Sequence, residues 1–156
     1  SHYFRPSPSW GGSCFPKDLV EVNNFYNQDE LNLPLISNII GSNNEHLQWT
    51  INQLRSMKKN NNLKTIVLVG AAFKEDTDDL RNSPTLDIYN VLNEMGEEVM
   101  ILDTEIDVPN YQSVKQLDEV PSNSLLSIMY PLKEELNMNI SNYANNNQCI
   151  IYYPWS

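Results

Sequence analysis

Residues 65–70 read Thr-Ile-Val-Leu-Val-Gly, and residues 98–103 read Glu-Val-Met-Ile-Leu-Asp. Both runs are rich in β-branched and aliphatic residues, which is typical of strands buried on both faces. Between them, Ser83-Pro84 supplies an N-cap residue and a proline at the first helical position, and Gly96 supplies a stop signal. The apolar face of the intervening helix is formed by Ile88, Val91, Leu92 and Met95. The order strand, helix, strand predicts a βαβ unit and therefore a parallel sheet with a right-handed crossover.

Further strands are predicted downstream of this unit, at residues 125–129 and 149–153. On the upstream side, a polar run at 58–62 predicts a linker. Residues 61–156 are therefore expected to form a domain of their own, and the predicted fold class is α/β.

The residues before the linker are predicted to be helical. Pro16 suits the first position of one helix, and a second, long helix is predicted over 34–58. Its apolar positions recur at helical spacing and comprise Ile36, Ile39, Ile40, Leu47 and Ile51. We expect this helix to pack away from the sheet and to present its apolar stripe to a partner chain or to another domain. Residues 1–60 are thus expected to belong to a separate helical domain.

Composition excludes several classes of function. The 156 residues carry a net charge of −10 and have a pI near 4.5, whereas nucleic-acid recognition requires clustered cations. No run approaches the roughly 20 apolar residues of a membrane span, and no secretory signal is visible in what we interpret as a piece of a longer protein. The two cysteines lie far apart without metal-ligand spacing, which favours a reduced, cytoplasmic setting.

A first candidate site lies at residues 11–18, Gly-Gly-Ser-Cys-Phe-Pro-Lys-Asp. The glycines allow a backbone to approach a ligand closely. Cys14 precedes a predicted helix, whose N-terminus favours a thiolate, and Lys17 adds a nearby cation. Asp18 offers a base or an orienting group. The alternative is a buried cysteine that acts as a small apolar residue, and the residues alone leave both interpretations open.

A second candidate site lies at residues 70–84, Gly-Ala-Ala-Phe-Lys-Glu-Asp-Thr-Asp-Asp-Leu-Arg-Asn-Ser-Pro. It follows a strand, at the edge where open α/β sheets bind ligands, but it lacks the GxGxxG dinucleotide fingerprint. Lys74 and Arg81 could contact phosphates near the helix N-terminus. Taken alone, the pattern favours a solvated loop in which these cations neutralise neighbouring carboxylates.

Taken together, the strings GGxCxPKD and AFKxxTDDxRxSP resemble the UDP-glucose/GDP-mannose dehydrogenase family over residues 2–103. The resemblance implies an N-terminal NAD-binding domain, a central helical segment that forms a homodimer, and a C-terminal Rossmann-like domain for the nucleotide sugar. This chain matches the end of the central segment, with its long dimerisation helix, and the C-terminal domain. The reaction that the resemblance implies oxidises the C6 hydroxyl of the sugar twice, with NAD as cofactor, through a cysteine thioester.

The resemblance also implies roles for individual residues. Cys14 matches the nucleophile and Asp18 the aspartate that helps activate water. Lys17 and Arg81 match cofactor-binding residues. The matches to substrate-binding residues are Tyr3, Trp10, Gly11 and Lys74.

Two departures from the family pattern affect the nucleotide-sugar pocket. Ser9 replaces a glycine and is expected to disfavour a positive φ. Residues 125–130, Leu-Leu-Ser-Ile-Met-Tyr, lack the Asn-Arg pair that often ends this strand.

The implied function is oxidation of UDP-glucose to UDP-glucuronate. GDP-mannose and UDP-N-acetylhexosamine are alternative substrates within the same class. A catalytically inactive protein that binds nucleotide sugars or only dimerises is the alternative from another class. No metal, nucleic acid or membrane partner is expected.

Overall fold

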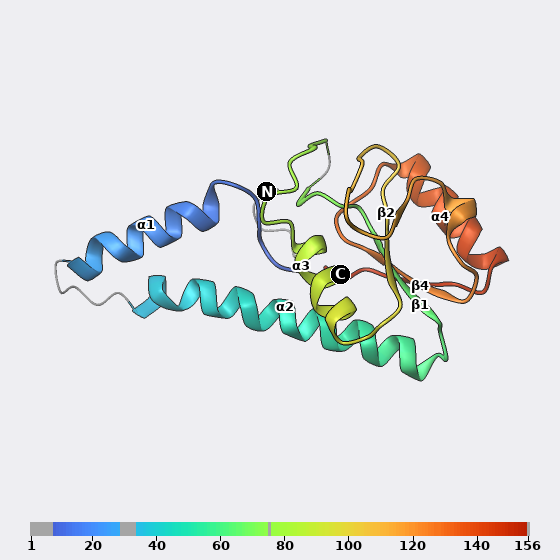
Figure 1. Ribbon diagram of the computed structural model, residues 1–156, viewed down its shortest axis with the longest axis horizontal. Coiled ribbons are helices and arrows are strands. Elements are labelled where there is room, and N and C mark those ends of the chain that lie inside the picture. Colours follow the sequence, from blue (N-terminus) through green and yellow to red (C-terminus); the bar gives the residue numbers. More distant parts are fainter. Residues whose placement is uncertain (1–7, 29–33, 75, 156) are drawn as a thin grey trace.

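The computed structural model describes residues 8–28, 34–74 and 76–155. Two helices come first and are followed by a sheet domain (Figure 1). In chain order the elements are α1 (Phe15–Gln28), α2 (Pro34–Asn60), β1 (Thr65–Val69), α3 (Pro84–Glu94), β2 (Val99–Leu102), β3 (Ser113–Val114), the 3-10 helix η2 (Leu117–Glu119), β4 (Ser124–Ile128), α4 (Glu134–Asn146) and β5 (Ile150–Tyr152). None of the helices described has the length and apolar character needed to cross a membrane.

The five strands form one parallel sheet in the order β3-β2-β1-β4-β5. The central strand β1 pairs with both neighbours, and Ile66 lies between Val99 and Leu125. The chain first adds strands on one side of β1 and then on the other, which creates a topological switch point between β1 and β4. The predicted α/β class with a parallel, Rossmann-like sheet is confirmed.

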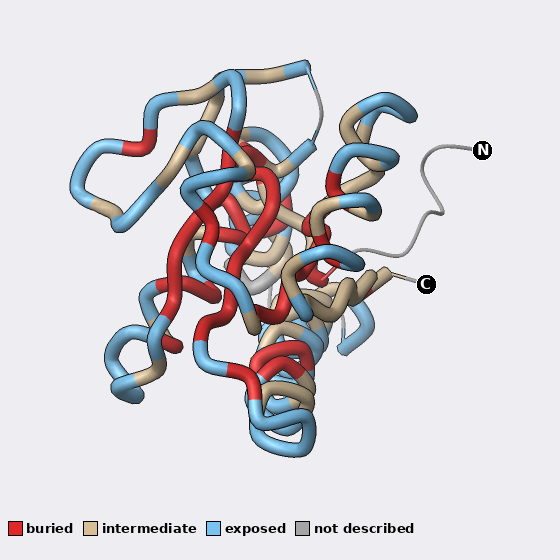
Figure 2. Tube along the Cα trace, turned by 90° about the vertical axis from the view of Figure 1, so that its right-hand side faces the viewer, coloured by how far each residue is buried: buried red, intermediate tan, exposed pale blue. Residues whose placement is uncertain are grey.

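Side chains of the sheet alternate between two apolar layers, as the period of a strand requires. One layer faces α2 and α3 and includes Ile66, Leu68, Ile101 and Leu125. The other layer faces α4 and includes Val67, Val69, Met100, Leu126 and Ile128. Figure 2 shows the buried residues concentrated in the strands and the exposed residues in the loops. Both faces of the sheet are therefore covered.

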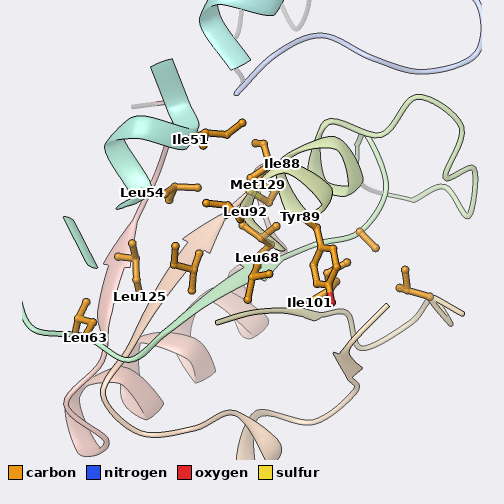
Figure 3. Close-up of a cluster of buried hydrophobic side chains, with 14 residues drawn as sticks. Ile51, Leu54, Leu63, Leu68, Ile88, Tyr89, Leu92, Ile101, Leu125 and Met129 are labelled. Carbon is orange, nitrogen blue, oxygen red and sulfur yellow. The ribbon is translucent and has the colours of Figure 1, made fainter. Parts of the chain in front are cut away.

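The expectation that the long helix packs away from the sheet is wrong for its C-terminal half. Ile51 and Leu54 of α2 are fully buried and join the layer that contains Leu125, as Figure 3 shows. The physical reason lies in the polar run taken for a linker. Leu63 N–H donates to the carbonyl of Lys58 at 2.9 Å, and Asn62 adopts a left-handed φ of 52°. This tight turn ends the helix and returns the chain directly into β1.

An ion-pair cluster also ties α2 to the sheet domain. One carboxylate oxygen of Glu97, between α3 and β2, lies 2.8 Å from Arg55, and the other lies 2.8 Å from Lys58. Hydrogen bonds from Lys58 and then Arg55 lower the pKa of Glu97 below its ordinary value. By contrast, α1 and the N-terminal half of α2 run alongside each other and extend away from the sheet (Figure 1), joined by a 2.9 Å hydrogen bond from Ser37 to Asn23.

The buried half of α2 makes a testable contribution to stability. Leu54→Ala should lower the free energy of unfolding by about 2–5 kcal/mol, because it leaves a cavity between the helix and the sheet. Met138→Ala is the control, since Met138 lies on α4 and is 60% exposed, and it should change stability by less than about 0.5 kcal/mol. Urea denaturation followed by circular dichroism measures both. Equal effects would contradict the packing described.

Candidate active site

The two sequence motifs meet where the cysteine loop docks on the turn before α3. The N–H of Gly12 donates to the carbonyl of Asn82 at 3.2 Å, and the side-chain amide of Asn82 donates back to the carbonyl of Gly12 at 3.1 Å. A Cβ added to Gly11 would lie 2.1 Å from the carbonyl oxygen of Asn82 and 2.8 Å from Cδ of Pro84. This approach is possible only for glycine at position 11.

Cys14 lies directly before α1, with its side chain exposed. Its carbonyl accepts the N–H of Asp18 at 2.9 Å, so the cysteine occupies the position that caps the helix. The helix dipole therefore favours negative charge at this point. Lys17 is exposed and forms an i,i+4 ion pair with Glu21 at 3.5 Å. The first turn of α1 thus presents a thiol, an ammonium group and a carboxylate to solvent.

An aspartate–arginine pair stands beside the cysteine loop. Arg81 donates from Nε and Nη2 to the two carboxylate oxygens of Asp79, both at 2.8 Å. These bonds hold the pKa of Asp79 well below its usual range, chiefly through the Arg81 side chain and with a smaller contribution from Ser13. The pKa of Arg81 is raised, chiefly by the hydrogen bond and the charge of Asp79. Arg81 directly precedes Asn82, the residue that pairs with Gly12 of the cysteine loop.

The opposite side of the cysteine loop is anchored to α2. The side-chain oxygen of Asn43 accepts the Trp10 N–H at 2.9 Å, and its amide nitrogen donates to the Trp10 carbonyl at 3.1 Å. Thr50 donates to the carbonyl of Pro8 at 3.3 Å. The Trp10 ring contacts Phe15 edge-on at 4.9 Å. Ser9 is buried and is not among the described residues with positive φ, so serine in place of glycine introduces no backbone strain here.

The loop between β1 and α3 is fixed by hydrogen bonds to its backbone. Asp103, at the end of β2, accepts the N–H of Ala71 at 2.8 Å. The Ser83 hydroxyl donates to the carbonyl of Ala71 at 2.5 Å. Farther along, the Phe73 ring packs against Gly12, and the exposed ammonium of Lys74 lies 5.4 Å from the centre of that ring. Lys74 is thus held next to the cysteine loop through an aromatic spacer.

A hollow lies at the carboxyl ends of β1, β2 and β4, at the switch point of the sheet. We call it the switch-point hollow, and its lining includes Gly70, Asp76, Glu105, Tyr130 and Lys133. Lys133 is the one cation among the described lining residues. Its ammonium lies 3.2 Å from Asp76 and 3.4 Å from Glu105, and these carboxylates raise its pKa. Tyr130 packs against Gly70. It is the last residue of the segment 125–130, which lacks the Asn-Arg pair of the family pattern.

The structure brings some of the predicted site residues together. Those gathered where the cysteine loop docks are Trp10, Gly11, Cys14 and Arg81. Those on the exposed first turn of α1 are Lys17 and Asp18. Lys74 lies on the adjoining loop, and Tyr3 lies outside the described residues. Their catalytic and binding roles stay predictions.

Sequence reasoning missed Asn43, Asn82 and Lys133. The signal available for Lys133 was its position shortly after the third predicted strand, at the ligand-binding edge of the sheet. The two asparagines gave no signal, because their importance depends on which backbone they meet in the folded chain.

Comparisons with known proteins agree with this arrangement. The central-domain profile of the UDP-glucose/GDP-mannose dehydrogenase family matches residues 1–45, and the UDP binding domain profile matches residues 67–145. The chain belongs to this family.

Individual relatives include two types of enzyme. GDP-mannose 6-dehydrogenase of Pseudomonas aeruginosa is 29% identical over 140 residues, which cover 79% of this chain and 31% of the relative. UDP-glucose 6-dehydrogenase of Rickettsia bellii is 28% identical over 102 residues, which cover 65% of this chain and 24% of the relative. A crystal structure of a ternary complex of GDP-mannose dehydrogenase from Pseudomonas aeruginosa superimposes with a TM-score of 0.79 and 25% identity, covering 98% of this chain and 38% of that one. The chain thus spans about a third or less of the curated relatives it matches.

The surroundings of the two cysteines predict a difference in reactivity. Cys14 is exposed, whereas Cys149 is half-buried directly before β5, with its sulfur 3.6 Å from the carbonyl of Asn147. Iodoacetamide should therefore alkylate Cys14 faster, by a factor on the order of ten, as followed by peptide mass spectrometry. In urea the two rates should converge. Faster labelling of Cys149 in the folded chain would contradict the exposed position of Cys14.

Proposed function

We propose that this chain supplies the nucleophilic cysteine and the nucleotide-binding domain of an NAD-dependent nucleotide-sugar 6-dehydrogenase. The observation that carries the proposal is the docking of the Cys14 loop on the turn that holds Arg81, in a family whose two domain profiles both match. The docked loop places an exposed thiol at a helix N-terminus, on the backbone that pairs with the residue after Arg81. From this placement we infer that the thiol is the nucleophile that attacks a carbonyl.

The proposed chemistry assigns a covalent step to Cys14. The thiolate adds to the C6 aldehyde of the sugar, and the resulting thiohemiacetal loses a hydride to become a thioester. Water then hydrolyses the thioester, releasing the uronate and the free thiol. Asp18, exposed one helical turn beyond Cys14, accepts the proton of that water. A thiol suits these steps because its thioester is more labile to water than an oxygen ester.

The cations around the thiol fit an anionic dinucleotide. Arg81 and Lys17 are both largely exposed, at 74% and 70% of their side-chain area, although each is ion-paired, with Asp79 and Glu21. In this proposal the phosphate groups compete with these carboxylates for the two cations. NAD, when bound, accepts the two hydrides that leave C6. The sequence holds no GxGxxG motif, so we propose that a separate dinucleotide-binding domain completes the site.

We propose UDP-glucose as the substrate, with its nucleotide at the carboxyl edge of the sheet and its sugar directed toward Cys14. The profile that matches residues 67–145 is that of a UDP binding domain, and these residues include the switch-point hollow. Lys74 and Lys133 are the cations placed to meet the diphosphate. GDP-mannose is the second candidate, since GDP-mannose 6-dehydrogenases are among the similar relatives. Titration with UDP and GDP distinguishes them.

The projecting pair of helices fits assembly of two copies. The exposed large apolar residues on α1 and α2 include Val20, Val22, Phe25, Leu35 and Trp49. Large apolar side chains exposed on a projecting pair of helices are typical of an interaction surface. We propose a homodimer that buries it, and analytical ultracentrifugation showing only monomers at high concentration would contradict this.

Nucleotide binding is the direct test of the two cations. Lys74→Ala and Lys133→Ala should each weaken UDP binding by about 1.5–3 kcal/mol, the range for a hydrogen bond to a charged group. Lys115→Ala is the matched control, because Lys115 is also ion-paired, with Asp107 at 2.7 Å, but lies outside the lining of the switch-point hollow. Isothermal titration calorimetry measures all three. Unchanged affinity in the first two variants would leave both lysines as surface charges.

Catalysis requires the chain joined to an NAD-binding domain. In that enzyme Cys14→Ala should abolish uronate formation while leaving UDP affinity unchanged, because the nucleotide contacts lie elsewhere. Asp18→Asn should slow hydrolysis more than the first hydride transfer, so that an acyl-enzyme accumulates and is visible by intact mass spectrometry. A Cys14→Ala enzyme that turns over at a near-native rate would remove the assignment of the nucleophile.

A further inference from the structure

We propose that Asn43 and Asn82 are positioning residues that hold the Cys14 loop between α2 and the sheet domain and thereby keep the thiol next to Arg81. This proposal rests on the proposed function only for its catalytic consequence. The clamp itself is a structural claim that can be tested without turnover. Neither asparagine contacts the reacting atoms in this proposal.

The clamp consists of two reciprocal pairings with the loop backbone. Asn43 satisfies both the N–H and the carbonyl of Trp10 through its side-chain amide, at 2.9 and 3.1 Å. Asn82 satisfies both groups of Gly12, accepting with its main-chain oxygen at 3.2 Å and donating with its side chain at 3.1 Å. The pairings approach the loop from two different elements. Together they fix two alternate residues of an irregular segment that has no sheet neighbour to pair with.

Asparagine is the residue that this geometry requires. Asn43 needs a donor and an acceptor on one short planar group, which aspartate or alanine cannot offer. Asn82 adopts a φ of 50°, a left-handed conformation that asparagine tolerates better than most residues. An aspartate at position 82 would place a carboxylate oxygen against the carbonyl of Gly12 and repel it.

The clamp controls the distance between the thiol and the guanidinium because of chain adjacency. Cys14 lies two residues beyond Gly12, and Arg81 directly precedes Asn82. Pairing Gly12 with Asn82 therefore joins the backbone segment that carries Cys14 to the segment that carries Arg81. The missing side chain at Gly11 lets the backbones approach this closely. Loss of either pairing frees one side of the loop and lets Cys14 move away from Arg81.

The test compares a negative and a neutral alkylating reagent on the same thiol. A guanidinium next to Cys14 attracts iodoacetate but not iodoacetamide, so the ratio of the two rates reports the local field. The same ratio at Cys149 in the same molecule serves as the internal reference. Arg81→Gln should lower the Cys14 ratio by about threefold, the effect of one nearby charge at surface dielectric.

Asn82→Gly and Asn43→Ala should lower the ratio in the same direction, and the double variant should approach the Arg81→Gln value. Glycine keeps the left-handed φ at position 82 and removes only the side-chain bond. Asn110→Gly is its matched control, an exposed asparagine with a φ of 71° away from the loop. Asn44→Ala is the control for Asn43→Ala, on the exposed adjacent position of α2. Both controls should leave the ratio unchanged.

Thermal unfolding of each variant separates loss of the clamp from loss of the fold. If one of the two asparagine variants is unstable, the alkylation ratio of the other variant alone tests the proposal. An unchanged ratio in the folded double variant would overturn the proposal. In the enzyme joined to its NAD-binding domain, Asn82→Gly should lower kcat several-fold with little change in KM, because substrate contacts are kept. If Cys14→Ala abolishes turnover but the double variant behaves as wild type, the clamp fails and the nucleophile assignment stands. If Cys14→Ala retains turnover, the proposed function fails instead.

Discussion

A side chain at position 11 would overlap the carbonyl oxygen of Asn82, so the cysteine loop and the turn before α3 can meet only backbone to backbone. This close approach joins two segments that lie about half the chain apart. It also joins the segment that carries Cys14 to the segment that carries Arg81. Without it, the thiol would sit on a projecting helix with no relation to the sheet domain, and the proposed division of labour between thiol and nucleotide site would have no structural basis.

The long helix α2 supports this close approach because it contacts both the sheet and the cysteine loop. Its C-terminal half is buried against the sheet through Ile51 and Leu54, while its N-terminal half carries Asn43 and the cysteine loop. A rigid helix that spans both regions transmits the position of the sheet core to the loop. The apolar stripe noticed in the sequence therefore joins the sheet core through Leu47 and Ile51, whereas Ile36, Ile39 and Ile40 are only half-buried.

The sequence predicted the βαβ unit because its signals are local: continuous apolar strands, the Ser83-Pro84 start and Gly96 at the end. It did not predict the packing of α2, since a polar run such as 58–62 has the same composition in a flexible linker and in a left-handed helix stop. Lys133 was missed because ion pairing across three loops leaves no periodic pattern. The departure at Ser9 looked unfavourable only because its φ had to be guessed. Features set by neighbouring residues could be predicted from the sequence, whereas contacts between distant segments could not.

The central claim is that Cys14 faces the sugar of a nucleotide sugar bound to the same chain. A UDP-glucose analogue with a chloroacetyl group at C6 tests it directly, because its electrophile reports which thiol the bound sugar reaches. Peptide mass spectrometry should find the analogue on Cys14, not on Cys149, and excess UDP should block the labelling. Labelling that UDP does not block, or that falls mainly on Cys149, would contradict the account.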